Sequence, residues 1–203
     1  EIVDRLWLSL TGATDYSSLI AQINKDEIDA IYLAVGSAVT VDLLQQLKDY
    51  GFEDFPIFCN ATCADTDVLI NDSAVILEGV YSGSHVTQTM PYESYNEFVK
   101  LYREVCGDPE RWPGIFSVDP YVGLEVMHAS LVKLYNDGKN IKDNYLDYQQ
   151  YLRETDMMTV RGPFKFDETQ GVVFTSYLNR VERDENGNLY NLSLIHISEP
   201  TRP

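Results

Sequence analysis

Basic residues are scarce in this chain of 203 residues. Lys and Arg total 15 against 32 Asp and Glu, which gives a formal net charge of -17. Such an excess of acid repels phosphate backbones and anionic lipid surfaces, so we expect no nucleic-acid partner. Long apolar runs are also absent, and no segment is predicted to cross a membrane as a helix. The length is still sufficient to bury a hydrophobic core.

Catalytic motifs are missing as well. The sequence has no Gly-x-Ser-x-Gly elbow, no Gly-x-Gly-x-x-Gly loop and no phosphate-binding P-loop. Histidine is rare: His85 has no paired ligand near it in the sequence, and His128 lies one helical turn after Leu124, as expected of a packed or half-exposed helix residue. We therefore predict no enzymatic activity, no cofactor and no metal site. A Rossmann-type enzyme would need a nucleotide loop or an acid-base pair outside this chain.

Cysteine is limited to Cys59, Cys63 and Cys106. The short spacer Asn-Ala-Thr would let Cys59 and Cys63 form a disulfide or share a metal. A zinc site would need further ligands, which the neighbouring sequence does not supply. We expect plain thiols that line a loop and a helix, and the odd count leaves at least one thiol without an intrachain partner.

Helix and strand signals alternate in the first part of the chain. Asp15 is a natural N-cap, and the apolar spacing that follows it predicts a helix over about residues 17–25. The continuous apolar run at 29–35 is too short for a typical helix and suits a strand buried on both faces. Residues 5–10 also have the pattern of a strand.

A second helix and strand come next. Apolar residues recur at helical spacing at Leu43, Leu44, Leu47 and Tyr50. Gly51 fits the end of this helix, and Phe55–Phe58 supplies the next short strand. Strands that alternate with helices predict an α/β fold with a parallel sheet.

The second half of the chain predicts further elements of both kinds. An amphipathic helix follows Pro91 and carries Tyr92, Tyr95, Phe98, Val99 and Tyr102. Two more helices are predicted at 118–135 and 145–153. Strands are predicted at 160–166, at 172–181 and from 189 onward, with turns at 168–171 and 184–187.

Several of these segments resemble one known family in their order along the chain, over roughly residues 10 to 180. The matching segments are Asp15–Ile23, Asp29–Leu33, the helix ending at Gly51, Pro56–Phe58, Glu78–Tyr81, Tyr121–Glu125 and Val160–Asp167. Together they resemble the branched-chain amino-acid-binding family of periplasmic solute receptors.

The resemblance implies a type I periplasmic-binding fold, with Rossmann-like parallel-sheet lobes joined by a hinge. It implies that most of the first lobe lies outside this chain. The expected ranges are 1–90 for most of the second lobe, 91–115 for a helix and hinge return, 116–158 for part of the first lobe and 159–191 for a hairpin and closing strands. The crossings between lobes are expected at 78–91 and 115–119.

The implied function is that of an extracytoplasmic solute-binding protein, in the periplasm or as a cell-surface lipoprotein. It would bind an amino acid or related small polar solute between its lobes and deliver it to the membrane permease of an ABC importer. A ligand-sensing ectodomain of a receptor or regulator has the same fold and is the alternative. A transmembrane segment or signalling domain at the true C-terminus would favour that alternative.

Ligands of parallel sheets sit beyond the carboxyl ends of the strands, where loops lead into helix N-termini. Backbone N–H groups there favour a carboxylate or other polar group. The candidate ligand-binding residues are Gly36, Ser37, Ala38, Asn60, Ala61 and Thr62. Thr40 and Asp65 are expected to cap the helices that follow these loops.

The candidate loops depart from the family pattern, which has a tyrosine in the first loop and a glutamate in the second to pair with the ligand ammonium. By position, this chain has Gly36 and Ser37 in place of the tyrosine and Ala61 in place of the glutamate. A buried ammonium without a carboxylate partner is unfavourable. Either an acid such as Asp65, Asp67 or Asp119 substitutes, or the ligand is an amide, a peptide, an aromatic acid or another small polar solute.

The end of the chain has a different character. Residues 192–202 read as a contiguous translation of a transposon-type sequencing adapter. The alternative is a natural strand followed by a polar tail. We expect residues 192–203 to be non-native, so they carry no argument about fold or function.

Overall fold

The computed structural model describes residues 1–9 and 14–198, and the side chains of these up to residue 195. The elements in chain order are α1 (Ser17–Ile20), η1 (Lys25–Glu27), β1 (Ile31–Leu33), α2 (Ser37–Asp49), β2 (Ile57–Asn60), η2 (Ala61–Ala64), α3 (Thr66–Leu69), η3 (Asp72–Leu77), β3 (Tyr81–Ser84), α4 (Glu93–Cys106), α5 (Ile115–Asn136), α6 (Tyr145–Arg153), β4 (Asp156–Thr159), β5 (Gly162–Phe166), β6 (Val172–Val173), β7 (Thr175–Arg183) and β8 (Leu189–Ser198). No helix among the described residues is both long and apolar enough to cross a bilayer.

The chain divides into two compact units. Unit 1 holds residues 1–84 and 178–195, and unit 2 holds residues 85–177. The chain thus leaves unit 1 within the crossing predicted at 78–91. The segment predicted as a second crossing, 115–119, instead opens α5 within unit 2, because its apolar side chains continue the buried face of that helix. The lobe ranges implied by the resemblance stay predictions.

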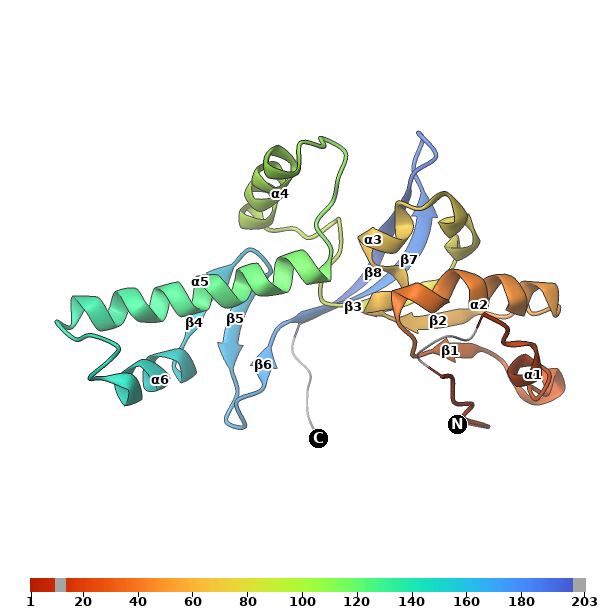
Figure 1. Ribbon diagram of the computed structural model, residues 1–203, viewed down its shortest axis with the longest axis horizontal. Helices are drawn as coiled ribbons and strands as arrows, with labels where there is room; N and C mark the ends of the chain where they lie inside the picture. The colour runs from red at the N-terminus through yellow and green to blue at the C-terminus, as the bar shows by residue number, and fades with distance from the viewer. Residues whose placement is uncertain (10–13, 199–203) are drawn as a thin grey trace. The chain divides into compact units, whose positions relative to one another are not determined.

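Unit 1 is built on a five-stranded sheet with the order β1-β2-β3-β7-β8. The first three strands run parallel (Figure 1). Ile31 pairs with Ile57, and Phe58 pairs with Tyr81. This arrangement confirms the α/β fold with a parallel sheet that the alternating pattern predicts.

Helix α2 supplies much of the core of unit 1. Leu43, Leu44 and Leu47 are each at most 3% exposed and pack in one cluster with side chains of β1 and β2. Burial of a leucine side chain contributes about 1.5–3 kcal/mol relative to full exposure. The helix ends as predicted at Gly51, which has a φ of 77°, while the N–H of Phe52 donates to the carbonyl of Leu47.

Two predictions for the start of the chain are wrong in part. The helix expected over 17–25 stops at Ile20, and a separate 3-10 turn follows because the side chain of Asn24 accepts a hydrogen bond from the N–H of Asp26. The N-cap is Tyr16 rather than Asp15, although the Asp15 carboxylate accepts from the N–H of Ser17. The strand expected at 5–10 does not form over residues 5–9, and the described part of the sheet begins with β1. Leu10 lies outside the described residues.

Unit 2 contains α4, α5 and α6 and a three-stranded sheet in the order β4-β5-β6. Helix α6 has the predicted bounds, whereas α5 begins three residues earlier than predicted. The strand predicted at 160–166 is β5, which begins two residues later, at Gly162, because residues 160 and 161 form the turn from β4. Gly162 has a φ of 94°, which a residue with a side chain rarely adopts, so the chain turns there.

Strand β8 begins at Leu189, as predicted, and runs into the segment expected to be non-native. Within the described side chains of this strand, Asn191 donates a hydrogen bond to the carbonyl of Ala64 at 2.7 Å, which fixes the strand to unit 1. Strand formation does not reveal the origin of residues 192–198, which stays a prediction. Residues 199–203 of the predicted tail lie outside the described residues.

Candidate ligand-binding site

The parallel strands of unit 1 bring the two candidate loops to one edge of the sheet. Leu33 of β1 pairs with Cys59 of β2, and Asn60 pairs with Gly83 of β3. Strands in this register end together, so the loop from β1 into α2 and the loop from β2 into η2 are neighbours. Candidate residues 36–38 belong to the first loop and helix start, and residues 60–62 to the second.

A direct hydrogen bond joins the two loops. The hydroxyl of Thr62 donates to the backbone carbonyl of Val35 at 3.0 Å. The thiol of Cys63 contacts the same carbonyl at 3.3 Å. A buried carbonyl needs partners, and here both come from the loop that follows the neighbouring strand. This hydrogen bond therefore fixes the position of Thr62 in the second loop relative to Gly36 in the first.

The start of α2 has the properties of an anion-binding site. Gly36 is the N-cap residue, no side chain caps the helix, and its first turn contains no acid. A Cβ added to Gly36 would meet nothing within 4 Å. Ser37 and Ala38 are exposed. The positive end of the helix dipole and its first N–H groups are thus available from solvent.

Thr40 and Asp65 were both predicted to cap helices, and only the prediction for Asp65 is confirmed. Thr40 does not cap α2, because the helix already begins at Ser37 and Gly36 is the N-cap. Its buried hydroxyl instead donates to the carbonyl of Gly36 at 3.1 Å, which holds the first turn of the helix. Asp65 is the N-cap residue of α3, as predicted, although its side chain makes no capping hydrogen bond.

A surface hollow of about 410 Å³ lies beside the start of α2. It is lined by Ser37, Ala38, Val41, Asp42, Asp67, Val68, Asn71 and Ser73. The hollow therefore includes two of the six candidate residues, and Asn60, Ala61 and Thr62 are not among its lining residues. Sequence reasoning did not select Asp42 as a site residue, although it follows Ala38 by four residues and so shares its helical face.

The three acids considered as ammonium partners occupy different environments. Asp67 lines the hollow together with Ser37 and Ala38. Asp65 is only 6% exposed at the start of α3. Asp119 lies in unit 2, where other side chains already bind its carboxylate. Of these three acids, Asp67 is therefore the one placed to pair with a ligand ammonium group beside the candidate residues.

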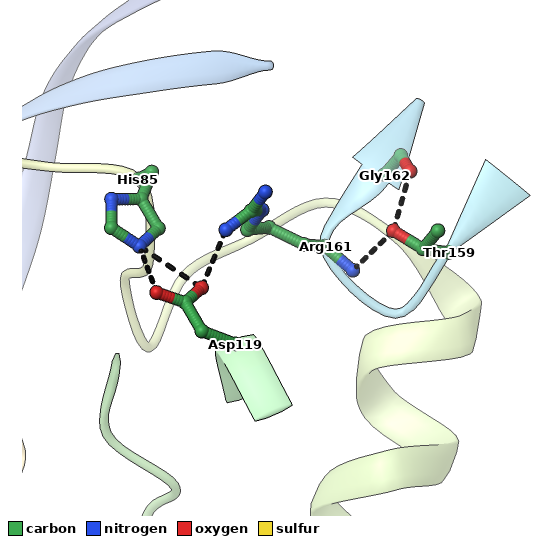
Figure 2. A network of polar contacts seen from close by, with 5 residues as sticks. All are labelled: His85, Asp119, Thr159, Arg161 and Gly162. Atoms are coloured by element: carbon green, nitrogen blue, oxygen red, sulfur yellow. Dashed lines mark hydrogen bonds and ion pairs between the residues drawn. The ribbon is translucent and has the colours of Figure 1, made fainter. Parts of the chain in front are cut away.

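Asp119 is the centre of a polar network in unit 2 (Figure 2). The Nε2 atom of His85 lies 2.8 Å and 3.0 Å from its two carboxylate oxygens, and the guanidinium of Arg161 donates to one of them. Burial raises the pKa of Asp119, but the hydrogen bonds and charges of His85 and Arg161 outweigh burial and hold this pKa below its usual range. The Asp119 charge is thus compensated within unit 2, which argues against an ammonium-binding role.

The turn that carries Arg161 is fixed by further hydrogen bonds. The Thr159 hydroxyl donates to the carbonyl of Gly162 and accepts from the N–H of Arg161 (Figure 2). The N–H of Val160 donates to the carboxylate of Glu125, whose pKa is raised by burial. These contacts join α5 to the β4–β5 turn, across separations in sequence that no local motif reveals.

All three cysteines are free thiols. Cys59 and Cys63 are buried in unit 1, and Cys106 is exposed at the end of α4. Over residues 1–9 and 14–198, no group of three or more His, Cys, Asp or Glu side chains is arranged to hold a metal ion. His128 is exposed on α5, rather than packed or half-exposed as expected.

Comparison with known proteins places this architecture in a family. Residues 1–187 match the sequence profile described as periplasmic binding protein. No curated protein matches the chain.

Solved structures share the fold. An ABC transporter substrate-binding protein from Sphaerobacter thermophilus matches with a TM-score of 0.80 and 23% identity, over 92% of this chain and 50% of that chain. A solute-binding protein from Rhodopseudomonas palustris in complex with 3,4-dihydroxybenzoic acid matches with a TM-score of 0.74 and 21% identity, over 91% and 49%. A leucine-binding protein from Thermotoga maritima has a TM-score of 0.74 and 17% identity, over 92% and 49%.

The chain thus spans about half the length of these solved structures. Identities below 25% show a common fold, which is the type I periplasmic-binding fold that the ordered segments imply. The profile match covers most of the sequence and agrees with the parallel sheet and strand-end loops of unit 1. This chain belongs to the periplasmic binding protein family.

Proposed function

We propose that the chain is part of an extracytoplasmic solute-binding protein that delivers a small polar solute to the permease of an ABC importer. The observation that supports this most directly is the hydrogen bond from Thr62 to the carbonyl of Val35, since it joins two strand-end loops at the edge where α/β sheets bind ligands. The proposed contact residues are Gly36, Ser37, Ala38, Asn60, Ala61 and Thr62. Membership of the family supports binding rather than catalysis.

The chemistry around α2 favours a ligand with both a carboxylate and an ammonium group. The uncapped N-terminus of α2 suits a carboxylate, because its first N–H groups and the helix dipole attract negative charge. The adjacent hollow carries the carboxylates of Asp42 and Asp67, which suit an ammonium group. We therefore propose an amino acid as the ligand, with Asp67 in the role that glutamate has in the family pattern.

The printed names of the relatives widen the range of solutes to be tested. One is a leucine-binding protein, and another was solved with 3,4-dihydroxybenzoic acid. Aromatic acids carry a carboxylate without an ammonium group, so they would use the start of α2 and make no use of Asp67. The two ligand classes can therefore be separated by experiment.

Thermal unfolding of the purified chain tests the proposal. The samples contain single amino acids, amides, short peptides or benzoic acids at increasing concentration. A ligand at a hundred times its Kd stabilises the folded state by about 2.7 kcal/mol, which gives a clear rise in midpoint. We expect a rise with one class of amino acid. A well-folded sample without a rise for any solute would contradict the proposed ligand class.

A further inference from the structure

Helix α5 carries apolar side chains on two faces. The buried face includes Val118, Val122, Val126 and Leu134, which recur at multiples of four residues. With about 3.6 residues per turn, five large apolar side chains fall on the roughly opposite face, and all are exposed: Phe116, Leu124, Met127, Leu131 and Tyr135. We call these five residues the apolar stripe. The stripe is about 28 Å long, given the helical rise per residue.

The charged residues of α5 lie outside the apolar stripe and already have partners. Asp119 is bound in the network of Figure 2, and Glu125 accepts a hydrogen bond from the β4–β5 turn. Lys133 lies 3.6 Å from the carboxylate of Glu154, just after α6. Charged residues make up 23% of the chain, so a stripe of this length without one is not an ordinary solvated helix face.

The apolar stripe has the composition of a surface that is buried by a second layer of protein. A surface helix has one apolar face, whereas a helix that is apolar on opposite faces is packed on both. Soluble monomers rarely expose a continuous apolar patch larger than about a few hundred Å². Within unit 2, α6 and β4 pack against α5 (Figure 1), and the stripe is exposed despite these contacts. Neither α6 nor β4 is therefore the second layer.

The family fold indicates what this layer is. The chain spans about half the length of the solved structures that share its fold. The small sheet of unit 2 is antiparallel, whereas the type I periplasmic-binding fold has lobes built on parallel sheets. Parallel sheets are covered by apolar helix faces on both sides. A helix with a free apolar face is thus complementary to a further parallel sheet.

We propose that the apolar stripe of α5 is a packing surface for the half of the family fold that this chain does not span, and that a parallel β-sheet from that half covers it. Helix α5 then lies between two layers, with α6 and β4 on one side and the apolar strands of the added sheet on the other. The proposal does not depend on the proposed function, because no ligand takes part in this contact.

Two other occupants fit the stripe less well. A second copy of the chain would bring together two molecules with a formal net charge of -17 each, which repel one another. Helices that lie on a bilayer surface have a polar face rich in Lys and Arg, and α5 contains one lysine and no arginine. A sheet from the same protein requires neither charge compensation nor a basic face.

Methionine oxidation tests the proposal without any substitution. The probe is dilute hydrogen peroxide, which adds one oxygen to an accessible methionine sulfur. Met127 belongs to the stripe, and Met158 on β4 is the native control, since both are exposed at 48% and 58%. Tryptic peptides 112–133 and 154–161 carry them, and fragmentation separates Met158 from Met157. The sample is the longer product encoded at the source locus, with the 203-residue chain beside it.

In the longer product, we expect Met127 to be oxidised about tenfold more slowly than Met158, and in denaturant the two rates should become equal. In the 203-residue chain the two rates should agree within about twofold. Equal rates in the folded longer product would overturn the proposal, and so would a source locus that encodes no further half of the fold. Protection of Met127 in the 203-residue chain that disappears on dilution would assign the stripe to a second copy instead.

A charged substitution gives a second, independent readout. Leu124→Glu should lower the thermal midpoint of the longer product clearly, because it places a charge against the added sheet. Ile70→Glu is the matched control, since Ile70 is 61% exposed in unit 1 and lies outside α5. Equal shifts from both substitutions would contradict a covered stripe. If no solute binds while Met127 is protected, the proposed function fails and the packing surface stands.

Discussion

The hydroxyl of Thr62 donates a hydrogen bond to the backbone carbonyl of Val35 at 3.0 Å, across a separation of 27 residues. This contact fixes the loop after β2 against the loop after β1. Both loops carry proposed contact residues, so their relative position determines the geometry that a solute meets. The side chain of Thr62 is only half-buried, which keeps the loop within reach of solvent.

Replacing Thr62 by valine keeps the shape of the side chain and removes the hydroxyl. We expect the Thr62→Val variant to lose about 1 kcal/mol in the free energy of unfolding, because one intramolecular hydrogen bond is lost. Ligand binding should weaken as well, since the two loops are no longer joined by this bond. Urea unfolding and a ligand titration measure the two effects.

A matched control is Thr155→Val in unit 2. The Thr155 hydroxyl donates to the carbonyl of Tyr151 at 3.0 Å, so the same kind of bond is lost far from the candidate loops in sequence. This variant should lose a similar free energy of unfolding and keep its ligand affinity. Equal losses of affinity in both variants would show that the Thr62 contact has no special role in binding.

Asp67 should matter for ligands that carry an ammonium group. In the Asp67→Asn variant we expect the Kd for an amino acid to rise about tenfold or more, because a charged hydrogen bond of about 1.5–3 kcal/mol is lost. The Kd for an aromatic acid without an amine should stay unchanged. Asp72→Asn is the control, since Asp72 is exposed nearby and is not among the residues that line the hollow. Equal effects of both substitutions would contradict the role of Asp67.

The Asp119 network should make the free energy of unfolding depend on pH in the acidic range. The pKa of Asp119 in the folded state lies below its ordinary value of 3.8, so the carboxylate stabilises the fold above that value and this contribution is lost as the pH falls through the folded pKa. We expect the free energy of unfolding of the Asp119→Asn variant to fall less steeply with acid, below about pH 4, than that of the unmodified chain. Asp156→Asn, at an exposed site in the same unit, should keep the original slope. Parallel pH profiles for all three proteins would contradict this account.

Replacing a core leucine by alanine should cost far more free energy of unfolding than replacing a surface leucine. Leu47 is 2% exposed within the core of unit 1, and we expect Leu47→Ala to reduce the free energy of unfolding by about 2–5 kcal/mol. Leu124 is 63% exposed on α5, so Leu124→Ala should change it by no more than about 0.5 kcal/mol. Guanidinium unfolding of the two variants measures this difference. A large loss from Leu124→Ala would mean that this face of α5 is covered in solution.

The parts of the fold that were predictable from the sequence are those with local signals. The apolar spacing through Leu47 and the glycine at 51 indicated α2, and helix α6 was predicted with its bounds. The helix after Asp15 was overextended, because the Asn24 side chain starts a new turn that the apolar pattern does not reveal. The strand predicted at 160–166 begins only at Gly162, because residues 160 and 161 form a turn that ends at the positive φ of Gly162.

The candidate site is predictable from the sequence only at the level of its loops. The rule for strand ends selected residues 36–38 and 60–62, yet the hydrogen bonds of the Thr62 hydroxyl with Val35 and of the Cys63 thiol with Asn60 depend on side-chain placement. The network of His85, Asp119 and Arg161 joins residues 34 and 42 positions apart. Contacts at such distances arise from packing, and no motif in one sequence encodes them.

The central claim is that the edge formed by the two loops binds a small polar solute, and a calorimetric titration of two tryptophan variants tests it most directly. Ala38→Trp places a bulky ring at the start of α2, while Ala30→Trp places the same ring at an exposed position just before β1, at the opposite end of that strand. The account predicts that Ala38→Trp abolishes binding of the solute identified by thermal unfolding and that Ala30→Trp retains the original Kd. Retained binding by a well-folded Ala38→Trp variant would contradict the assignment of the site.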